Sequence, residues 1–176
     1  MVLPKGSAGH SGRRSWAVTH LPGARIRSCP PRGGHRNLLD GCRNAGLTVV
    51  LATSGAKSDL DWMLPRIGAH DVVMGAITSD DVVASKPAPD LLTAALKEHR
   101  LDSARTAVVG DTVWDVEAAQ RAGLPCIALL SGGIAEAKLR DAGAIEVYED
   151  PADLLAKLES SLLRTLVRRV PRNTRR

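Results

Sequence analysis

The sequence predicts an α/β fold, a three-layer doubly wound parallel sheet, and three observations support this prediction. Apolar runs of strand length alternate with helix-patterned segments between residues 37 and 163, which requires parallel strands with right-handed crossovers. Only 2% of the residues are aromatic and none is Phe, so the core is expected to consist of Val, Leu, Ile and Ala, as in a buried parallel sheet. A length of 176 residues suits one domain.

The charge distribution divides the chain into three parts. Residues 1–36 carry seven Lys or Arg and no acid, residues 164–176 carry six Arg and no acid, and all 19 acids lie from Asp40 to Glu159. We therefore expect a disordered basic N-terminal segment at 1–36, a core domain at 37–163 and a disordered basic tail at 164–176. Clustered Arg side chains can contact nucleic-acid phosphates, but no aromatic ladder accompanies them, so nucleic acid is a disfavoured partner.

Capping residues and glycines delimit the first expected elements of the core. Asn37 caps a short helix that Gly46 ends. Residues 47–52 form a compact, β-branched apolar run, which indicates a buried strand. Ser58 caps the next helix, which closes at Gly68.

After a strand-like piece and a loop at 71–85, strands and helices are again expected to alternate in the second half of the core. Helices are expected to end at glycines, and Pro151 suits the first position of the last helix. The expected helices are 90–99, 112–122, 134–141 and 151–163, and the expected strands are 106–109, 125–130 and 144–147. In such a sheet ligands gather at the carboxyl ends of the strands, which is where Thr53, Asp111 and Ser131 fall.

Two carboxylates follow the strand at 106–109. Asp111 ends this strand and Asp115 lies one turn into the following helix, and Mg²⁺ is commonly bound through one or two carboxylates with water and phosphate. The alternative is structural, with Asp111 as a helix N-cap and Asp115 as a first-turn acid that favours the helix dipole.

A cation and a hydroxyl-bearing turn complete the candidate site. Lys86 lies in a loop before Pro87, and an ammonium there can neutralise a phosphoryl group; the alternative is an exposed loop lysine. Thr53, Ser54 and Gly55 follow a buried strand, and their hydroxyl and backbone N–H groups suit phosphate oxygens. The alternative for these three is an ordinary strand-to-helix turn.

Joined in this order, the motifs resemble the haloacid dehalogenase-like (HAD) hydrolase superfamily, in its phosphoglycolate phosphatase or phosphoglucomutase-like subgroup. The matching pieces are Val49–Ser54, Lys86-Pro-Ala-Pro-Asp90 and Gly110-Asp111-Thr-Val-Trp-Asp115, within residues 37–160.

The resemblance implies a Mg²⁺-dependent phosphatase of small phosphorylated metabolites. It gives Thr53 and Lys86 catalytic roles. Thr53, Ser54, Gly55 and Lys86 would bind the substrate, and Asp111 and Asp115 would hold the metal.

The sequence departs from the family at its N-terminal motif. The family attacks phosphorus with an Asp of an Asp-x-Asp motif that ends the central strand, yet this chain has no acid before Asp40. We therefore expect no nucleophile, a missing N-terminal strand and cap, and impaired turnover. Residues 16–19, the only strand-like piece before residue 37, could replace that strand.

Two alternatives to an active enzyme remain open, an inactive phosphate-binding module and a truncated gene product. A phosphoacceptor receiver domain is disfavoured because its Lys follows its acids, whereas Lys86 precedes Asp111. Three widely spaced cysteines favour a reducing, cytoplasmic location. No apolar run reaches the ~18 residues of a membrane span. The sequence identifies neither the substrate nor the oligomeric state.

Overall fold

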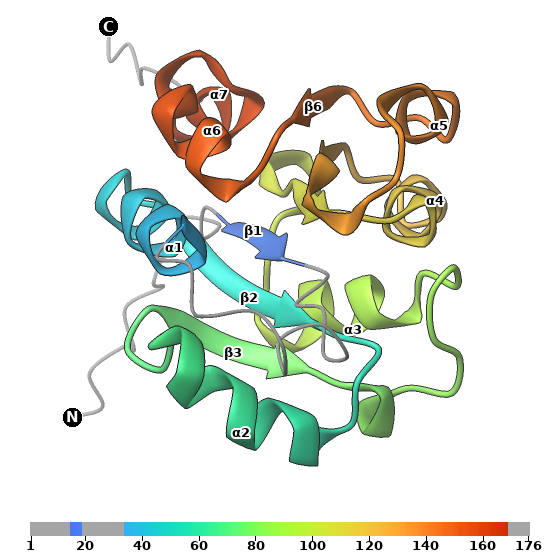
Figure 1. Ribbon diagram of the computed structural model, residues 1–176. Helices are drawn as coiled ribbons and strands as arrows, with labels where there is room; N and C mark the ends of the chain where they lie inside the picture. The colour runs from blue at the N-terminus through green and yellow to red at the C-terminus, as the bar shows by residue number, and fades with distance from the viewer. Residues whose placement is uncertain (1–14, 19–33, 169–176) are drawn as a thin grey trace, which may run out of the picture.

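The computed structural model describes residues 15–18 and 34–168, and they build a six-stranded sheet covered by helices (Figure 1). Every neighbouring pair of strands is parallel, in the order β3-β2-β1-β4-β5-β6. The strands are β1 (Ser15–Val18), β2 (Thr48–Ala52), β3 (Val73–Ile77), β4 (Val108–Gly110), β5 (Cys126–Leu129) and β6 (Glu146–Tyr148). The predicted doubly wound α/β sheet is confirmed.

Helices cover both faces of the sheet and make a three-layer structure. They are α1 (Gly34–Asn44), α2 (Lys57–Ile67), α3 (Asp90–Glu98), α4 (Val113–Arg121), α5 (Glu136–Asp141), α6 (Pro151–Ala156) and α7 (Leu162–Arg168). Short 3₁₀ turns are η1 (Ser79–Asp81), η2 (Ser103–Arg105), η3 (Leu130–Gly132) and η4 (Leu158–Ser160). Val49 and Leu51 of β2 pack with α1, α2, α6 and α7, whereas Val50 and Ala52 pack with α3, α4 and α5. All four are almost fully buried, as expected for a strand covered on both faces.

The centre of the sheet is occupied, so the expectation of a missing central strand is wrong. β1 lies between β2 and β4, with Trp16 opposite Val49 and Val18 opposite both Leu51 and Val109. The physical reason is that β2 and β4 would otherwise present two open edges of unpaired backbone groups. The strand-like piece expected as a replacement fills this place up to Val18, and its last residue, Thr19, lies outside the described residues.

Some element boundaries differ from the expected ones. Helix α1 begins at Gly34, ahead of the expected cap at Asn37. Helix α2 is capped at Ala56 instead of Ser58, because the Asp59 carboxylate accepts the Ala56 N–H at 3.2 Å. Helix α7 runs to Arg168 and so enters the range expected as a disordered tail. Among the helices that the structure describes, none has both the length and the apolar character to cross a membrane.

Candidate functional site

The carboxyl edge of the sheet brings most of the predicted site residues together. Thr53 follows β2, Asp111 follows β4, Asp115 lies in the first turn of α4, and Lys86 lies in the loop between η1 and α3. Thr53 and Asp111 are 7% and 6% exposed and Asp115 is fully buried. Polar side chains that are buried need hydrogen-bond or charge partners, so we take this edge of the sheet as the candidate functional site.

A buried ion pair lies at the centre of this group. The Lys86 Nζ is 2.8 Å from Asp115 Oδ1, and the two side chains are 4% and 0% exposed. The interpretation of Lys86 as an exposed loop lysine is therefore wrong. Arg121 of α4 donates a 2.6 Å hydrogen bond to the Pro87 carbonyl and so ties the lysine loop to the same helix.

The second oxygen of Asp115 fixes the turn after β4. Asp115 Oδ2 accepts hydrogen bonds from the Asp111 N–H at 3.2 Å, the Thr112 N–H at 3.0 Å and the Thr112 hydroxyl at 2.7 Å. The Thr112 hydroxyl oxygen in turn caps α4 by accepting the Asp115 N–H at 3.2 Å. Thr112, not Asp111, is thus the N-cap, and Asp111 does not serve the structural role that the alternative gave it.

Hydroxyl groups connect the loop after β2 with the loop that carries Lys86. The Thr53 Oγ1 accepts the Gly55 N–H at 3.1 Å, and the Ser85 hydroxyl donates to the Ser54 hydroxyl oxygen at 2.8 Å. The residues expected to bind a phosphoryl group therefore come from two loops that are hydrogen-bonded to each other.

The two carboxylates at this edge suit Mg²⁺ better than a metal ion that takes all of its ligands from protein side chains. Both carboxylate oxygens of Asp115 are engaged by Lys86, the backbone and Thr112. Asp111 and Asp115 are the carboxylates that could hold a metal ion here. In the described part of the chain no three His, Cys, Asp or Glu side chains cluster as a metal site. Mg²⁺ tolerates such a sparse set because water and substrate phosphate complete its shell.

A small cavity beside Asp111 adds a residue that the sequence did not single out. Its volume is about 20 Å³, its lining is mostly apolar, and His35, Asp111 and Ser131 are among the residues around it. His35 belongs to the first turn of α1. Burial lowers the pKa of His35, and the charge of Asp150 partly opposes this shift. Sequence reasoning missed His35 because it falls in the segment expected to be disordered, and no motif marks it.

The loop after β5 approaches this site closely. A Cβ atom on Gly132 of η3 would overlap the Asp111 backbone carbonyl. Only glycine allows η3 to reach Asp111, so Gly132 positions Ser131 at the cavity.

Comparison with known proteins places this geometry in context. Residues 13–123 match the sequence model described as Hydrolase: haloacid dehalogenase-like hydrolase. The chain is 35% identical over 118 residues to the protein SUPPRESSOR OF QUENCHING 1, chloroplastic, of Arabidopsis thaliana, covering 66% of this chain and 11% of that protein. It is 27% identical over 117 residues to a phosphoglycolate phosphatase of Rhodospirillum rubrum, covering 66% of this chain and 48% of the phosphatase. The chain thus spans less than half of either relative.

Solved structures show the same fold. A hydrolase from Pseudomonas syringae is 37% identical with a TM-score of 0.67, covering 72% of this chain and 61% of the hydrolase. CbbY from Rhodobacter sphaeroides, solved in complex with phosphate, is 26% identical with a TM-score of 0.60. That match covers 70% of this chain and 55% of CbbY.

Proposed function

Because the chain belongs to the haloacid dehalogenase-like hydrolase family, we propose that it binds and slowly hydrolyses small phosphate monoesters in a Mg²⁺-dependent manner. The family resemblance inferred from the motifs is confirmed, with phosphatases among the relatives. The observation that carries the proposal is the buried Lys86–Asp115 pair beside Asp111, because a cation and carboxylates are held there without exposure to bulk water.

We propose a role for each site residue. The ammonium of Lys86 neutralises the phosphoryl group, and Asp115 positions that ammonium through the 2.8 Å contact. Thr53 and Ser54 bind the phosphoryl oxygens through their hydroxyl groups, and Gly55 shapes this loop by donating its N–H to the Thr53 Oγ1 at 3.1 Å. Asp111 would hold Mg²⁺ directly and Asp115 through water; when bound, the ion supplies charge stabilisation at the phosphoryl oxygens.

Turnover is proposed to be impaired because the family's nucleophile has no counterpart. The chain carries no Asp or Glu before Asp40, so no carboxylate follows the central strand to form an aspartyl-phosphate. This observation also favours the second candidate, a phosphate-binding module that uses the same residues without catalysis.

Hydrolysis of para-nitrophenyl phosphate by the full chain distinguishes the two candidates. We expect slow hydrolysis that a chelator abolishes and that Asp111→Asn removes, with no acid-trapped phosphoryl-enzyme. Phosphate binding without any hydrolysis would establish the binding module instead. Neither binding nor hydrolysis by folded protein would contradict both candidates.

A further inference from the structure

The loop of residues 82–89 joins η1 to α3 and carries Lys86. It belongs to no helix or strand, and its two prolines, Pro87 and Pro89, have no backbone N–H to donate. Lys86 itself has a flexible four-carbon side chain, which does not fix the position of its ammonium group. The position of this ammonium therefore depends on contacts between the 82–89 loop and other parts of the fold.

Side chains from three neighbouring segments hold the 82–89 loop. The hydrogen bonds are those of Asp90 with the Ala84 N–H at 3.2 Å, Ser54 with the Ser85 hydroxyl at 2.8 Å, and Arg121 with the Pro87 carbonyl at 2.6 Å. The first two lie before Lys86 in the chain, and the Arg121 bond lies directly after it. This bond is the shortest of the three, and its donor is charged, which makes it stronger than a hydrogen bond between neutral groups.

The guanidinium group of Arg121 is held by two partners. Its Nη1 donates to the Pro87 carbonyl, while its Nη2 pairs at 3.0 Å with the Oε2 of Glu117, four residues earlier on α4. The same helix carries Asp115, which pairs with the Lys86 ammonium at 2.8 Å. One helix therefore contacts both the ammonium of Lys86 and the backbone of the residue that follows it.

We propose that Arg121 is a positioning residue of the phosphate site, which acts through Lys86. The inference rests on the proposed function, in which the Lys86 ammonium neutralises the phosphoryl group. While Arg121 holds the Pro87 carbonyl, the ammonium stays close to Asp115 at the edge of the sheet. Without this bond the loop takes up other positions, and a displacement of about 1 Å is enough to weaken the action of such a group strongly.

Calorimetric titration of inorganic phosphate with MgCl₂ into the full chain compares the wild type with Arg121→Met. We expect the dissociation constant of phosphate to rise by about tenfold, as for the loss of one charge-assisted hydrogen bond. Arg121→Lys keeps a charged donor and should restore part of the affinity. The midpoint of urea denaturation should change little in Arg121→Met, because the side chain is 50% exposed.

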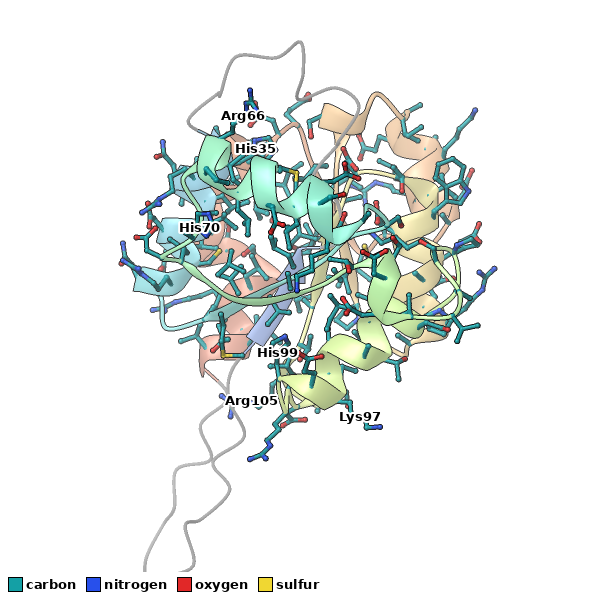
Figure 2. All side chains as sticks on the ribbon, turned by 90° about the horizontal axis from the view of Figure 1, so that it is seen from below. His35, Arg66, His70, Lys97, His99 and Arg105 are labelled. Carbon is teal, nitrogen blue, oxygen red and sulfur yellow. The ribbon has the colours of Figure 1, made fainter. Side chains whose placement is uncertain are left out.

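Two other cations control for the loss of a positive charge. Arg140 matches Arg121 because its side chain is 51% exposed and pairs with a glutamate four residues earlier, Glu136 at 2.7 Å, but this pair lies within α5. Lys97 lies in the last turn of α3, the helix that follows the loop, and Figure 2 shows it in the lower part of the view. Arg140→Met and Lys97→Met should each bind phosphate within about twofold of the wild type.

Amide hydrogen exchange observes the 82–89 loop without phosphate. The Ala88 N–H donates to the Ser85 carbonyl at 3.0 Å inside this loop, so its exchange reports local opening. We expect this exchange to be about tenfold faster in Arg121→Met and unchanged in Arg140→Met and Lys97→Met. Equal exchange rates in the wild type and Arg121→Met would contradict the role of Arg121.

The outcomes of the titration separate this proposal from the proposed function. Phosphate binding that is equally strong in the wild type and in Arg121→Met overturns the role of Arg121 and leaves the phosphate site standing. An equal loss of affinity in Arg140→Met assigns the effect to charge alone and also overturns that role. Absence of phosphate binding by folded wild-type chain overturns the proposed function, and the role of Arg121 with it.

Discussion

Removing the ammonium of Lys86 is expected to destabilise the fold strongly. Lys86→Met keeps an unbranched side chain of similar length but leaves Asp115, which is 0% exposed, without its cation at 2.8 Å. Breaking a buried ion pair from one side typically costs about 3–5 kcal/mol. Asp115 keeps three hydrogen bonds from Asp111 and Thr112, so we expect the lower end of this range, about 3 kcal/mol.

Urea denaturation followed by circular dichroism measures this loss, and the chain offers a matched control. Lys157 and Asp153 form an ion pair of 2.7 Å, but their side chains are 58% and 22% exposed. Exposed pairs contribute only about 0–1 kcal/mol, so Lys157→Met should lower the free energy of unfolding by less than 1 kcal/mol. Equal losses in the two variants would refute the reasoning that burial makes the Lys86 contact strong.

Three further predictions concern the same edge of the sheet. Gly132→Ala introduces an overlap with the Asp111 carbonyl and should lower stability by about 1–3 kcal/mol, whereas an unchanged melting temperature would contradict the close approach. Thr112→Ala removes both the α4 cap and a 2.7 Å hydrogen bond to Asp115; we expect a loss of about 1–2 kcal/mol in urea titrations, with Thr112→Ser near wild type. Burial lowers the pKa of His35. Below about pH 6.5 the unfolded chain therefore binds more protons than the folded chain, and the free energy of unfolding decreases as the pH decreases. His35→Gln should flatten this slope in melting curves recorded from pH 7 to pH 5, and an unchanged slope would show that His35 is not the source.

The sequence predicted most of the fold because its signals are local. The buried run of β2 and the glycines that end α2 and α4 mark these elements directly. Gly68, for example, takes a positive φ of 62°, a backbone conformation that glycine adopts without strain. The first residues of helices were predicted less well. The cap of α2, for example, depends on a hydrogen bond from the Ala56 N–H to the Asp59 carboxylate, which no single residue type predicts.

The central strand shows the limit of local reasoning. Residues 15–18 are a short piece in a segment rich in Gly, Pro and Arg, so composition alone predicts disorder there. Their position is set by the two neighbouring strands, β2 and β4, with which they pair in register. Such pairing is a tertiary effect that overrides local propensity.

Residue type and order were enough to select the residues of the candidate site, but not to predict the ion pair and hydrogen bonds between them. The spacing of Asp111 and Asp115 did not reveal that one Asp115 oxygen forms an ion pair with Lys86 while the other accepts a hydrogen bond from Thr112, the cap of α4. Nor could it reveal His35, which reaches the site only because α1 begins near the cap of α6, with Gly34 close to Ala152.

Calorimetric titration of inorganic phosphate into the full chain tests the central claim most directly, with and without MgCl₂. The account predicts phosphate binding that Mg²⁺ strengthens and that loses this Mg²⁺ dependence in Asp111→Asn, while the exposed-site variant Lys157→Met binds as wild type. Phosphate binding that is absent from folded protein, or that is unaffected by both Mg²⁺ and Asp111→Asn, would contradict the assignment of this edge of the sheet as a magnesium-dependent phosphate site.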